Sequence, residues 1–290
     1  MKEMDMEIFH KGLPRTFLGL SAKRQEAEVV VLSCPYDSTT SYGCGARGGP
    51  AAIIEASRQV ELYDIELGQD ISKKVRIFTE DELEVDRGNP KRNCQFVQEA
   101  VECVLEEGKF PVLFGGEHSV SIGAFWAAEK KIGKGLSVLH IDAHADMREE
   151  YEGSQYSHAC TMARCRESLH AVSVGIRSYS EEEAVEIEKI RQDFFGVEFD
   201  AEKVIKRLKP AVYVTIDLDG FDPSEVPAVG TPEPGGLRYL QVLDLLRKVA
   251  KSRKIVGFDV VELSPIPSNV VSEFLAAKLA YKLIGYAHLK

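Results

Sequence analysis

The chain has 290 residues, of which 44% are hydrophobic, and it carries a formal net charge of −10 at pH 7. This composition suits a globular α/β domain and argues against a nucleic-acid-binding surface, which is usually basic. The apolar runs are too short to span a membrane and the N-terminus lacks a signal-peptide core, so we expect a cytoplasmic protein that binds neither nucleic acid nor membrane.

Seven apolar runs rich in β-branched residues recur along the chain and predict strands buried on both faces. They lie at Val29–Leu32, Val75–Phe78, Val112–Phe114, Leu136–Ile141, Ala171–Ile176, Val212–Ile216 and Ile255–Val261. Helical patterns lie between and after them, at Gly49–Gln59, Cys94–Glu107, Ser119–Lys131, Glu181–Gln192, Ala201–Lys209, Arg238–Lys251 and Val270–Gly285. This alternation predicts a three-layer α/β/α fold with a parallel sheet, and we treat residues 1–290 as a single domain.

The first of three unusual strand ends is Gly115-Gly116-Glu117-His118, which follows the run at Val112–Phe114. The two glycines allow a close backbone approach or a positive φ. A lone histidine at such a place is more often a polar residue at a helix start than a ligand. His118 is therefore a candidate ligand only in combination with the other strand ends.

The second strand end carries the strongest signal, because the run Leu136–Ile141 leads directly into Asp142, His144 and Asp146. Carboxylates this close repel one another unless a cation lies among them. In an extended strand Asp142 and Asp146 would lie about 13 Å apart, whereas two oxygens on one ion lie at most about 4.4 Å apart. The chain must therefore curl after Asp142 if these residues share a metal site. The alternative is a solvated acidic loop.

The third strand end is the run Val212–Ile216, which is followed by Asp217 and Asp219. In open α/β sheets the carboxyl ends of the strands form the ligand-binding edge, so the three strand ends should meet there. Six ligands suit two metal ions, and an oxygen-rich set without cysteine favours a hard ion such as Mn²⁺. The candidate ligands are His118, Asp142, His144, Asp146, Asp217 and Asp219.

Three further polar residues fall at the same predicted edge. Glu262 lies in an apolar context, where a buried carboxylate needs a partner. For His158, a catalytic role and a plain surface-loop position remain open alternatives. Arg47 is more often a helix-capping or subunit-contact residue than a catalytic one. The acids at Glu181–Glu183 are interpreted as solvated helix surface.

Taken together, these motifs resemble the ureohydrolases, the arginase–agmatinase family. The resemblance implies a mainly parallel eight-stranded sheet and a dinuclear manganese site, in chains that assemble as homotrimers or homohexamers. The matching segments run in order along nearly the whole chain: Cys34-Pro-Tyr-Asp-Ser, Gly45-Ala-Arg-Gly-Gly-Pro, Gly115-Gly-Glu-His-Ser, Asp142-Ala-His-Ala-Asp, Ser157-His-Ala, Asp217-Leu-Asp-Gly-Phe-Asp-Pro and Asp259-Val-Val-Glu-Leu-Ser-Pro.

The resemblance also implies a role for each site residue. His118 and Asp146 would bind one Mn²⁺, and His144 and Asp219 would bind the other. Asp142 and Asp217 would bridge both ions, with a hydroxide between the metals. His158 would move protons, and Glu262 would bind the guanidinium group of the substrate.

The loop Arg148–His158 resembles the agmatinase form of the family, because it lacks the Ser-Gly-Asn-His-Gly-like stretch with which arginases hold an α-amino acid. We therefore expect an agmatinase that converts agmatine to putrescine and urea. The acids and tyrosines of Glu149–Tyr156 should face the cationic tail of the substrate. Ala159 and Cys44 stand where glycine and proline are usual, which leaves chain-length specificity open.

Several alternatives remain at this point. Within the family they are guanidinobutyrase, aminopropylagmatine ureohydrolase and arginase. Outside it they are a single-zinc deacetylase of related fold and a non-enzymatic metal-binding protein. A deacetylase needs only part of the ligand set, so the presence of His118, Asp146 and Asp219 counts against it.

Overall fold

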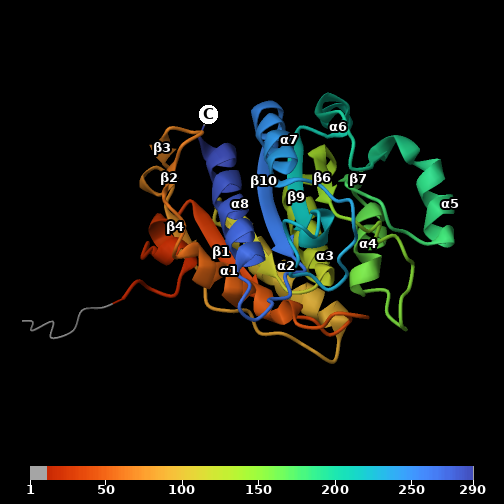
Figure 1. Ribbon diagram of the computed structural model, residues 1–290, viewed down its shortest axis with the longest axis horizontal. Coiled ribbons are helices and arrows are strands. Elements are labelled where there is room, and N and C mark those ends of the chain that lie inside the picture. Colours follow the sequence, from red (N-terminus) through yellow and green to blue (C-terminus); the bar gives the residue numbers. More distant parts are fainter. Residues whose placement is uncertain (1–11, 290) are drawn as a thin grey trace, which may run out of the picture.

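The computed structural model describes residues 12–289 (Figure 1), and a central sheet of eight strands organises them. The strands lie in the order β4-β1-β5-β10-β9-β6-β7-β8, and each neighbouring pair is parallel. The predicted parallel eight-stranded sheet is therefore confirmed. The strands are β1 (Val29–Cys34), β4 (Ile77–Thr79), β5 (Phe110–Gly115), β6 (Leu136–Ile141), β7 (His170–Val174), β8 (Phe194–Phe195), β9 (Ala211–Asp217) and β10 (Lys254–Val261).

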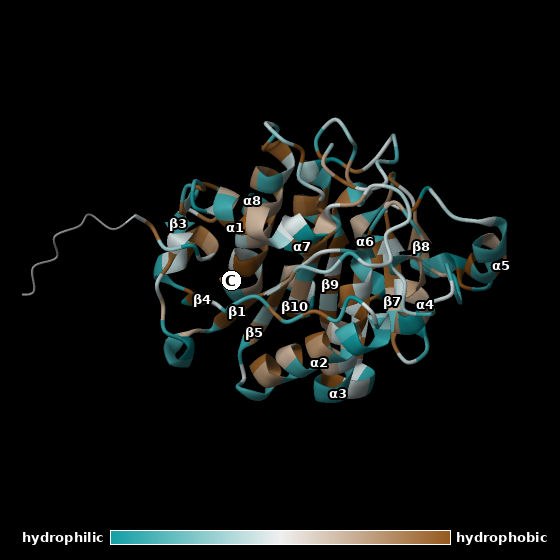
Figure 2. Ribbon diagram, turned by 90° about the horizontal axis from the view of Figure 1, so that it is seen from below, coloured by the Kyte–Doolittle hydropathy of each residue, from teal (hydrophilic) through white to brown (hydrophobic). Residues whose placement is uncertain are grey.

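Helices cover both faces of this sheet, as Figure 2 shows. Helices α1, α6, α7 and α8 lie on one face, and α2, α3 and α4 lie on the other, so the predicted three-layer architecture is confirmed. The helices are α1 (Gly49–Ser57), α2 (Pro90–Glu106), α3 (Ser121–Ile132), α4 (Thr161–Arg166), α5 (Glu181–Lys189), α6 (Ala201–Arg207), α7 (Tyr239–Ser252) and α8 (Val271–His288). A small antiparallel pair, β2 (Tyr63–Asp64) and β3 (Gln69–Asp70), lies outside the main sheet.

Local sequence explains where the longer helices begin and which side they bury. The side chain of Asn89 accepts a hydrogen bond from the backbone N–H of Arg92, and Pro90 follows at the first position of α2, where its missing N–H costs nothing. In α7 the positions with no exposed surface are spaced by three and four residues, which is the period of one helix face. These positions are Val242, Leu245, Leu246 and Val249.

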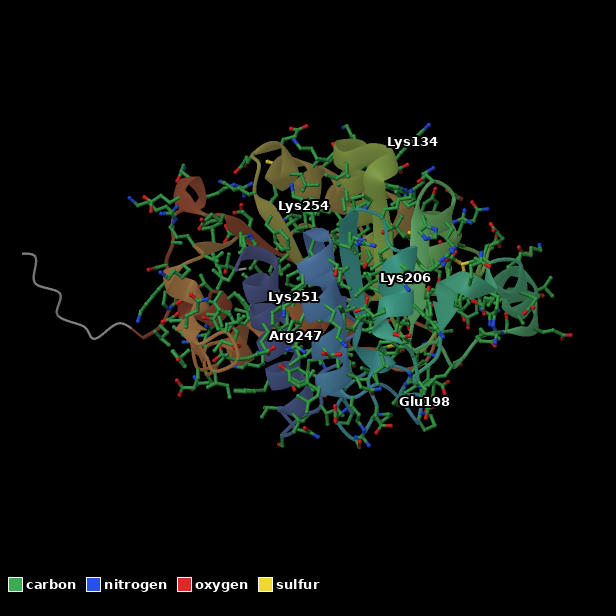
Figure 3. All side chains as sticks on the ribbon, turned by 90° about the horizontal axis from the view of Figure 1, so that it is seen from above. Lys134, Glu198, Lys206, Arg247, Lys251 and Lys254 are labelled. Atoms are coloured by element: carbon green, nitrogen blue, oxygen red, sulfur yellow. The ribbon has the colours of Figure 1, made fainter. Side chains whose placement is uncertain are left out.

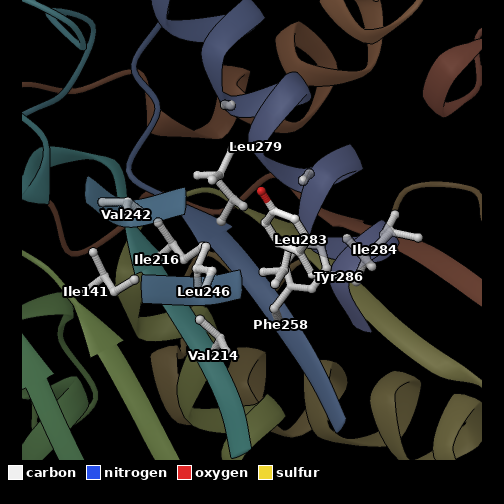
Figure 4. Close-up of a cluster of buried hydrophobic side chains, with 14 of the residues drawn as sticks. Ile141, Val214, Ile216, Val242, Leu246, Phe258, Leu279, Leu283, Ile284 and Tyr286 are labelled. Carbon is white, nitrogen blue, oxygen red and sulfur yellow. The ribbon is translucent and has the colours of Figure 1, made fainter. Parts of the chain in front are cut away.

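The core between the sheet and α7 and α8 consists of aliphatic and aromatic side chains (Figure 4). Burying one such side chain contributes roughly 1.5–3 kcal/mol to the stability of the fold. The central strands β6, β9 and β10 each supply side chains of this kind. The sheet residues are Ile141, Val214, Ile216 and Phe258, and the helix residues facing them include Leu246, Leu279 and Leu283. A second apolar cluster fills the other face, beneath α2 and α3.

Charged side chains cover the outer surface of the helical layers. Figure 3 shows Lys206 on α6 and Arg247 and Lys251 on α7 among them. Within residues 12–289, no helix combines the length and the apolar character that a membrane crossing requires.

The strand order decides where the functional residues meet. After β5 the chain crosses to β6, which is not the neighbour of β5 in the sheet. The two strands that lie between β5 and β6, β10 and β9, come later in the sequence. The carboxyl ends of β5, β10, β9 and β6 are consequently neighbours at the centre of one sheet edge. A change of direction of this kind is where open α/β sheets bind ligands.

Candidate functional site

All six predicted ligands converge at this central edge. His118 opens a short 3₁₀ helix after β5, Asp142 directly follows β6, and Asp217 is the last residue of β9. The predicted curl after Asp142 is present, because Asp146 adopts a left-handed φ of 52°. Its neighbours at positions 143 and 145 are buried alanines, which are small enough to permit that path.

Three carboxylates surround the ring of His118. Its Nδ1 atom lies 3.1 Å from Asp142 Oδ2, 3.1 Å from Asp146 Oδ2 and 3.2 Å from Asp217 Oδ2. This nitrogen is buried and makes no well-aligned hydrogen bond to any residue in the range 12–289. A nitrogen lone pair and three carboxylate oxygens directed at one small space are the donor atoms that a divalent cation takes.

A second compact group lies beside the first and shares one residue with it. His144 Nδ1 lies 2.9 Å from Asp219 Oδ2 and 3.7 Å from Asp142 Oδ1. Asp142 thus has one oxygen in each group, which is the geometry a bridging ligand needs. Asp217 lies beside His118 but belongs to neither compact set of potential ligand atoms.

Burial and mutual repulsion strongly affect the protonation of this cluster. Burial, together with the charges of Asp219 and Asp142, raises the pKa of Asp217 well above its ordinary value. Burial would also raise the pKa of Asp142, but His140 and His118 outweigh it and hold that pKa well below the ordinary range. Ionised carboxylates in this cluster therefore need nearby positive charge, and a bound cation could supply that charge.

The donor set fits hard divalent ions. It contains carboxylate oxygens and imidazole nitrogens but no thiolate, a combination suited to ions such as Mn²⁺. Together with the unpartnered Nδ1 of His118, this chemistry makes the cluster a candidate site for metal ions.

The cluster forms one end of a cavity of about 290 Å³. Tyr42, Tyr151 and Tyr179 contribute aromatic side chains to its walls, and Tyr42 is 82% exposed. Arg148 also lines the cavity, with its guanidinium carbon 5.1 Å from the centre of the Tyr151 ring. The cavity is therefore acidic at the metal end and has aromatic walls.

Glu262 and His158, the two predicted catalytic or substrate-binding residues, both line this cavity. Glu262 has a left-handed φ of 65°, and its Oε1 accepts a hydrogen bond of 2.6 Å from the backbone N–H of His118. Burial and the charge of Glu117 raise the pKa of Glu262 well above its ordinary value. A carboxylate in this position gains from a cationic ligand, because the cation offsets the cost of burying its charge.

Comparison with known proteins identifies the family. The model of the arginase family matches residues 27–285. The chain belongs to the arginase family. It is 39% identical to the N(1)-aminopropylagmatine ureohydrolase of Synechocystis sp. over 94% of both chains, and 35% identical to the agmatinase of Bacillus anthracis over 87% of this chain and 89% of that one. Its fold is similar to that of the agmatine ureohydrolase of Thermoplasma volcanium, with a TM-score of 0.84, 33% identity and 92% of each chain covered.

One prediction about this arginase-family cavity is wrong. The glutamates of the loop Glu149–Tyr156 do not line it, although Tyr151 does. Glu149 is instead largely exposed and pairs with Arg164 at 2.6 Å. The loop turns its acids outward because a cation of α4 binds the first of them and solvent reaches the others.

Besides Glu262 and the carboxylates of the metal cluster, the cavity is lined by an acid from α5, where the sequence suggested only solvated helix surface. Glu183 is buried, and its carboxylate accepts hydrogen bonds from the backbone N–H groups of Met147 (2.9 Å) and Ser180 (2.8 Å). The sequence contains a signal for this position, because Ser180 followed three residues later by Glu183 is a capping box, which turns the glutamate back toward the helix start.

Arg47 is the third polar residue, besides Glu262 and His158, that the sequence places at this edge of the sheet. It does not line the cavity and lies 3.5 Å from Asp37, with about half of its side chain exposed. This position is consistent with the structural interpretation of Arg47.

His140 is a site residue that the sequence interpretation missed. It is buried in β6, with Nε2 2.7 Å from Asp142 Oδ2 and Nδ1 3.1 Å from Ser173 Oγ. A strand places residues two apart on the same face, so the spacing of His140 and Asp142 could have revealed the contact. His140 is therefore positioned to fix the orientation of the Asp142 carboxylate.

Proposed function

We propose that this chain hydrolyses the guanidinium group of a guanidinoalkylamine to urea and an amine, with two Mn²⁺ ions bound by the His/Asp cluster. The observation that carries the proposal is the placement of six candidate ligands beside the buried carboxylate of Glu262, at one end of an acidic cavity. One end of the cavity thus suits metal ions and a planar cation together.

The ligand geometry suggests how the metals divide. His118 and Asp146 would hold one ion, and His144 and Asp219 the other. Asp142 would contact both, and Asp217, beside His118, would complete the set. When bound, the ions lower the pKa of water so that a nucleophile exists near neutral pH.

The remaining chemistry falls to side chains of the chain itself. A guanidinium carbon is a poor electrophile, because its positive charge is delocalised over three nitrogens. Glu262 would orient the group through charge-assisted hydrogen bonds. As the carbon–oxygen bond forms and the bond to the alkyl-substituted nitrogen breaks, that nitrogen needs a proton, which His158 would supply. The products are urea and the free amine.

Two substrates fit this chemistry. The sequence alone favours agmatine. The second candidate is N(1)-aminopropylagmatine, and it is supported by two relatives of that name, which are 39% and 38% identical to this chain, against 35% and 34% for two Bacillus agmatinases. Tyrosine faces on the cavity walls can hold additional ammonium groups through cation–π contacts, so we expect the longer amine to be the better substrate.

A paired urea-release assay distinguishes the candidates. We expect both amines to be hydrolysed and N(1)-aminopropylagmatine to have the higher kcat/KM. Arginine and guanidinobutyrate should be poorer substrates by a few orders of magnitude, because their carboxylate would be buried near Glu183 and the metal-site acids at a cost of several kcal/mol. Equal or faster hydrolysis of arginine would contradict the assignment to amines and leave the hydrolytic chemistry intact.

The contact between His140 and Asp142 gives a prediction for metal affinity. Replacing His140 by phenylalanine keeps an aromatic ring in the core but removes the nitrogen that contacts Asp142. We expect Mn²⁺ affinity to fall roughly 10- to 100-fold, the usual effect of losing a group that orients a ligand. Titration with Mn²⁺ measures this directly, and His170→Phe, in a half-buried position outside the cavity, is the control. Unchanged affinity in His140→Phe would mean that His140 only fills space.

A further inference from the structure

Glu117 is a buried carboxylate that the proposed reaction does not use. Its Oε1 accepts hydrogen bonds from the hydroxyls of Thr39 and Ser119, both at 2.5 Å, and its Oε2 accepts one of 2.6 Å from the backbone N–H of Thr39. Three donors converge on this carboxylate, and two of them belong to one residue. Glu117 therefore holds Thr39, from the loop after β1, firmly against the end of β5.

Thr39 in turn contacts His158, which lies 119 residues away in the sequence. The Thr39 hydroxyl accepts a hydrogen bond of 3.0 Å from the backbone N–H of His158, and the same oxygen lies 3.4 Å from the ring atom Nδ1. One threonine thus touches both the backbone and the ring of the histidine that we propose as the proton donor.

The donors and acceptors of this hydroxyl can be counted. A threonine hydroxyl has one proton and two lone pairs. The proton goes to Glu117, because the three donors that converge on Glu117 favour its ionised form, which can only accept, and one lone pair takes the backbone N–H of His158. Toward Nδ1 only a lone pair remains. A favourable contact there requires that Nδ1 carry a proton. Ser157 Oγ, 3.3 Å from the same nitrogen, can donate or accept and does not oppose this arrangement.

We propose that Thr39, held by Glu117, is a positioning residue that fixes the imidazole of His158 in the tautomer protonated at Nδ1, so that Nε2 is the nitrogen that exchanges a proton with the substrate. The kinetic consequence rests on the proposed function, whereas the tautomer itself can be observed without turnover. A histidine that donates a proton needs one ring nitrogen held by the protein and the other free to face the substrate. The hydrogen bond at the held nitrogen decides which of the two nitrogens carries the proton.

Two substitutions of Thr39 test the inference. Thr39→Val removes the hydroxyl but keeps the backbone N–H bond to Glu117, and Thr39→Ser keeps both. In the Mn²⁺-loaded enzyme we expect Thr39→Val to lower kcat roughly 10- to 100-fold, the same range as for the loss of a partner that orients a metal ligand. Its KM and metal content should remain those of the wild type, and Thr39→Ser should restore most of the kcat. Thr16→Val removes a hydroxyl bonded to the Leu20 carbonyl, outside the cavity, and is the matched control.

The third variant, Glu117→Gln, reverses the direction of the hydrogen bonds. The amide N–H₂ group would donate to the Thr39 oxygen and free the threonine proton to point at Nδ1. In ¹⁵N-histidine spectra of the diamagnetic Zn²⁺-loaded protein, assigned with His158→Asn, wild-type His158 should be protonated at Nδ1. In Glu117→Gln it should shift toward protonation at Nε2.

Each outcome has a defined meaning. Wild-type kcat in Thr39→Val, or a His158 protonated at Nε2 in the wild type, would overturn the proposal. Equal losses in Thr39→Val and Thr39→Ser, accompanied by a lower melting temperature, would reduce Thr39 to a structural residue and also overturn it. If the wild type releases no urea from any guanidino compound, the proposed function fails, and the tautomer measurement still decides the role of Thr39.

Discussion

The Asp142→Asn variant should bind neither Mn²⁺ ion with useful affinity and should lose nearly all turnover. Asp142 is the residue common to both compact ligand groups, with one oxygen near His118 and the other near His144. The substitution conserves shape but removes the negative charge that both ions share. Because the metals contribute several kcal/mol to the reaction and each 1.4 kcal/mol corresponds to a factor of ten in rate, we expect kcat to fall roughly 10³-fold or more.

Metal analysis of the purified variants, with urea release measured in parallel, checks this result. His118→Asn is the comparison, because His118 lies in only one of the two groups and its loss should mainly release one ion. Wild-type protein should hold two ions per chain. A stoichiometry near one in saturating Mn²⁺, or an Asp142→Asn variant that retains two ions, would refute the dinuclear arrangement.

The second large effect is expected for His158→Asn, which should lower kcat by roughly 10²–10⁴-fold while metal content stays at two ions per chain. The range is that of general acid–base catalysis, and metal binding should persist because His158 lies on the cavity wall outside both ligand groups. His170→Asn removes a histidine outside the cavity and should retain wild-type turnover. If His158→Asn also turns over at nearly the wild-type rate, His158 is only a loop residue.

The central strands could be predicted from the sequence because parallel strands buried on both faces need continuous apolar runs. The shortest elements gave no such signal. β8 has two residues and α4 has six, which is too short for either to show a period. The eight-stranded sheet was instead implied by the resemblance of the motifs to the ureohydrolases, and the family match over residues 27–285 agrees with that resemblance.

The metal cluster could also be predicted, because each strand end carries its ligands within a few residues of an apolar run. The contacts that join distant loops could not. Thr39, Glu117 and His158 come from three loops, and their contacts depend on how those loops pack. The outward turn of Glu149 is of the same kind, because it depends on an ion pair with Arg164 fifteen residues later. A pattern in the sequence indicates at which end of a strand, and so at which edge of the sheet, a residue lies. It does not indicate which side chain that residue contacts.

The most direct test of the proposed chemistry is the stoichiometry of products from the Mn²⁺-loaded wild-type chain. With N(1)-aminopropylagmatine or agmatine as substrate, one urea should appear for each amine released, and chelation of the metal should stop both. Failure to release urea from either amine, from arginine and from guanidinobutyrate, in protein that holds two Mn²⁺ ions per chain, would contradict the assignment of this site to guanidinium hydrolysis.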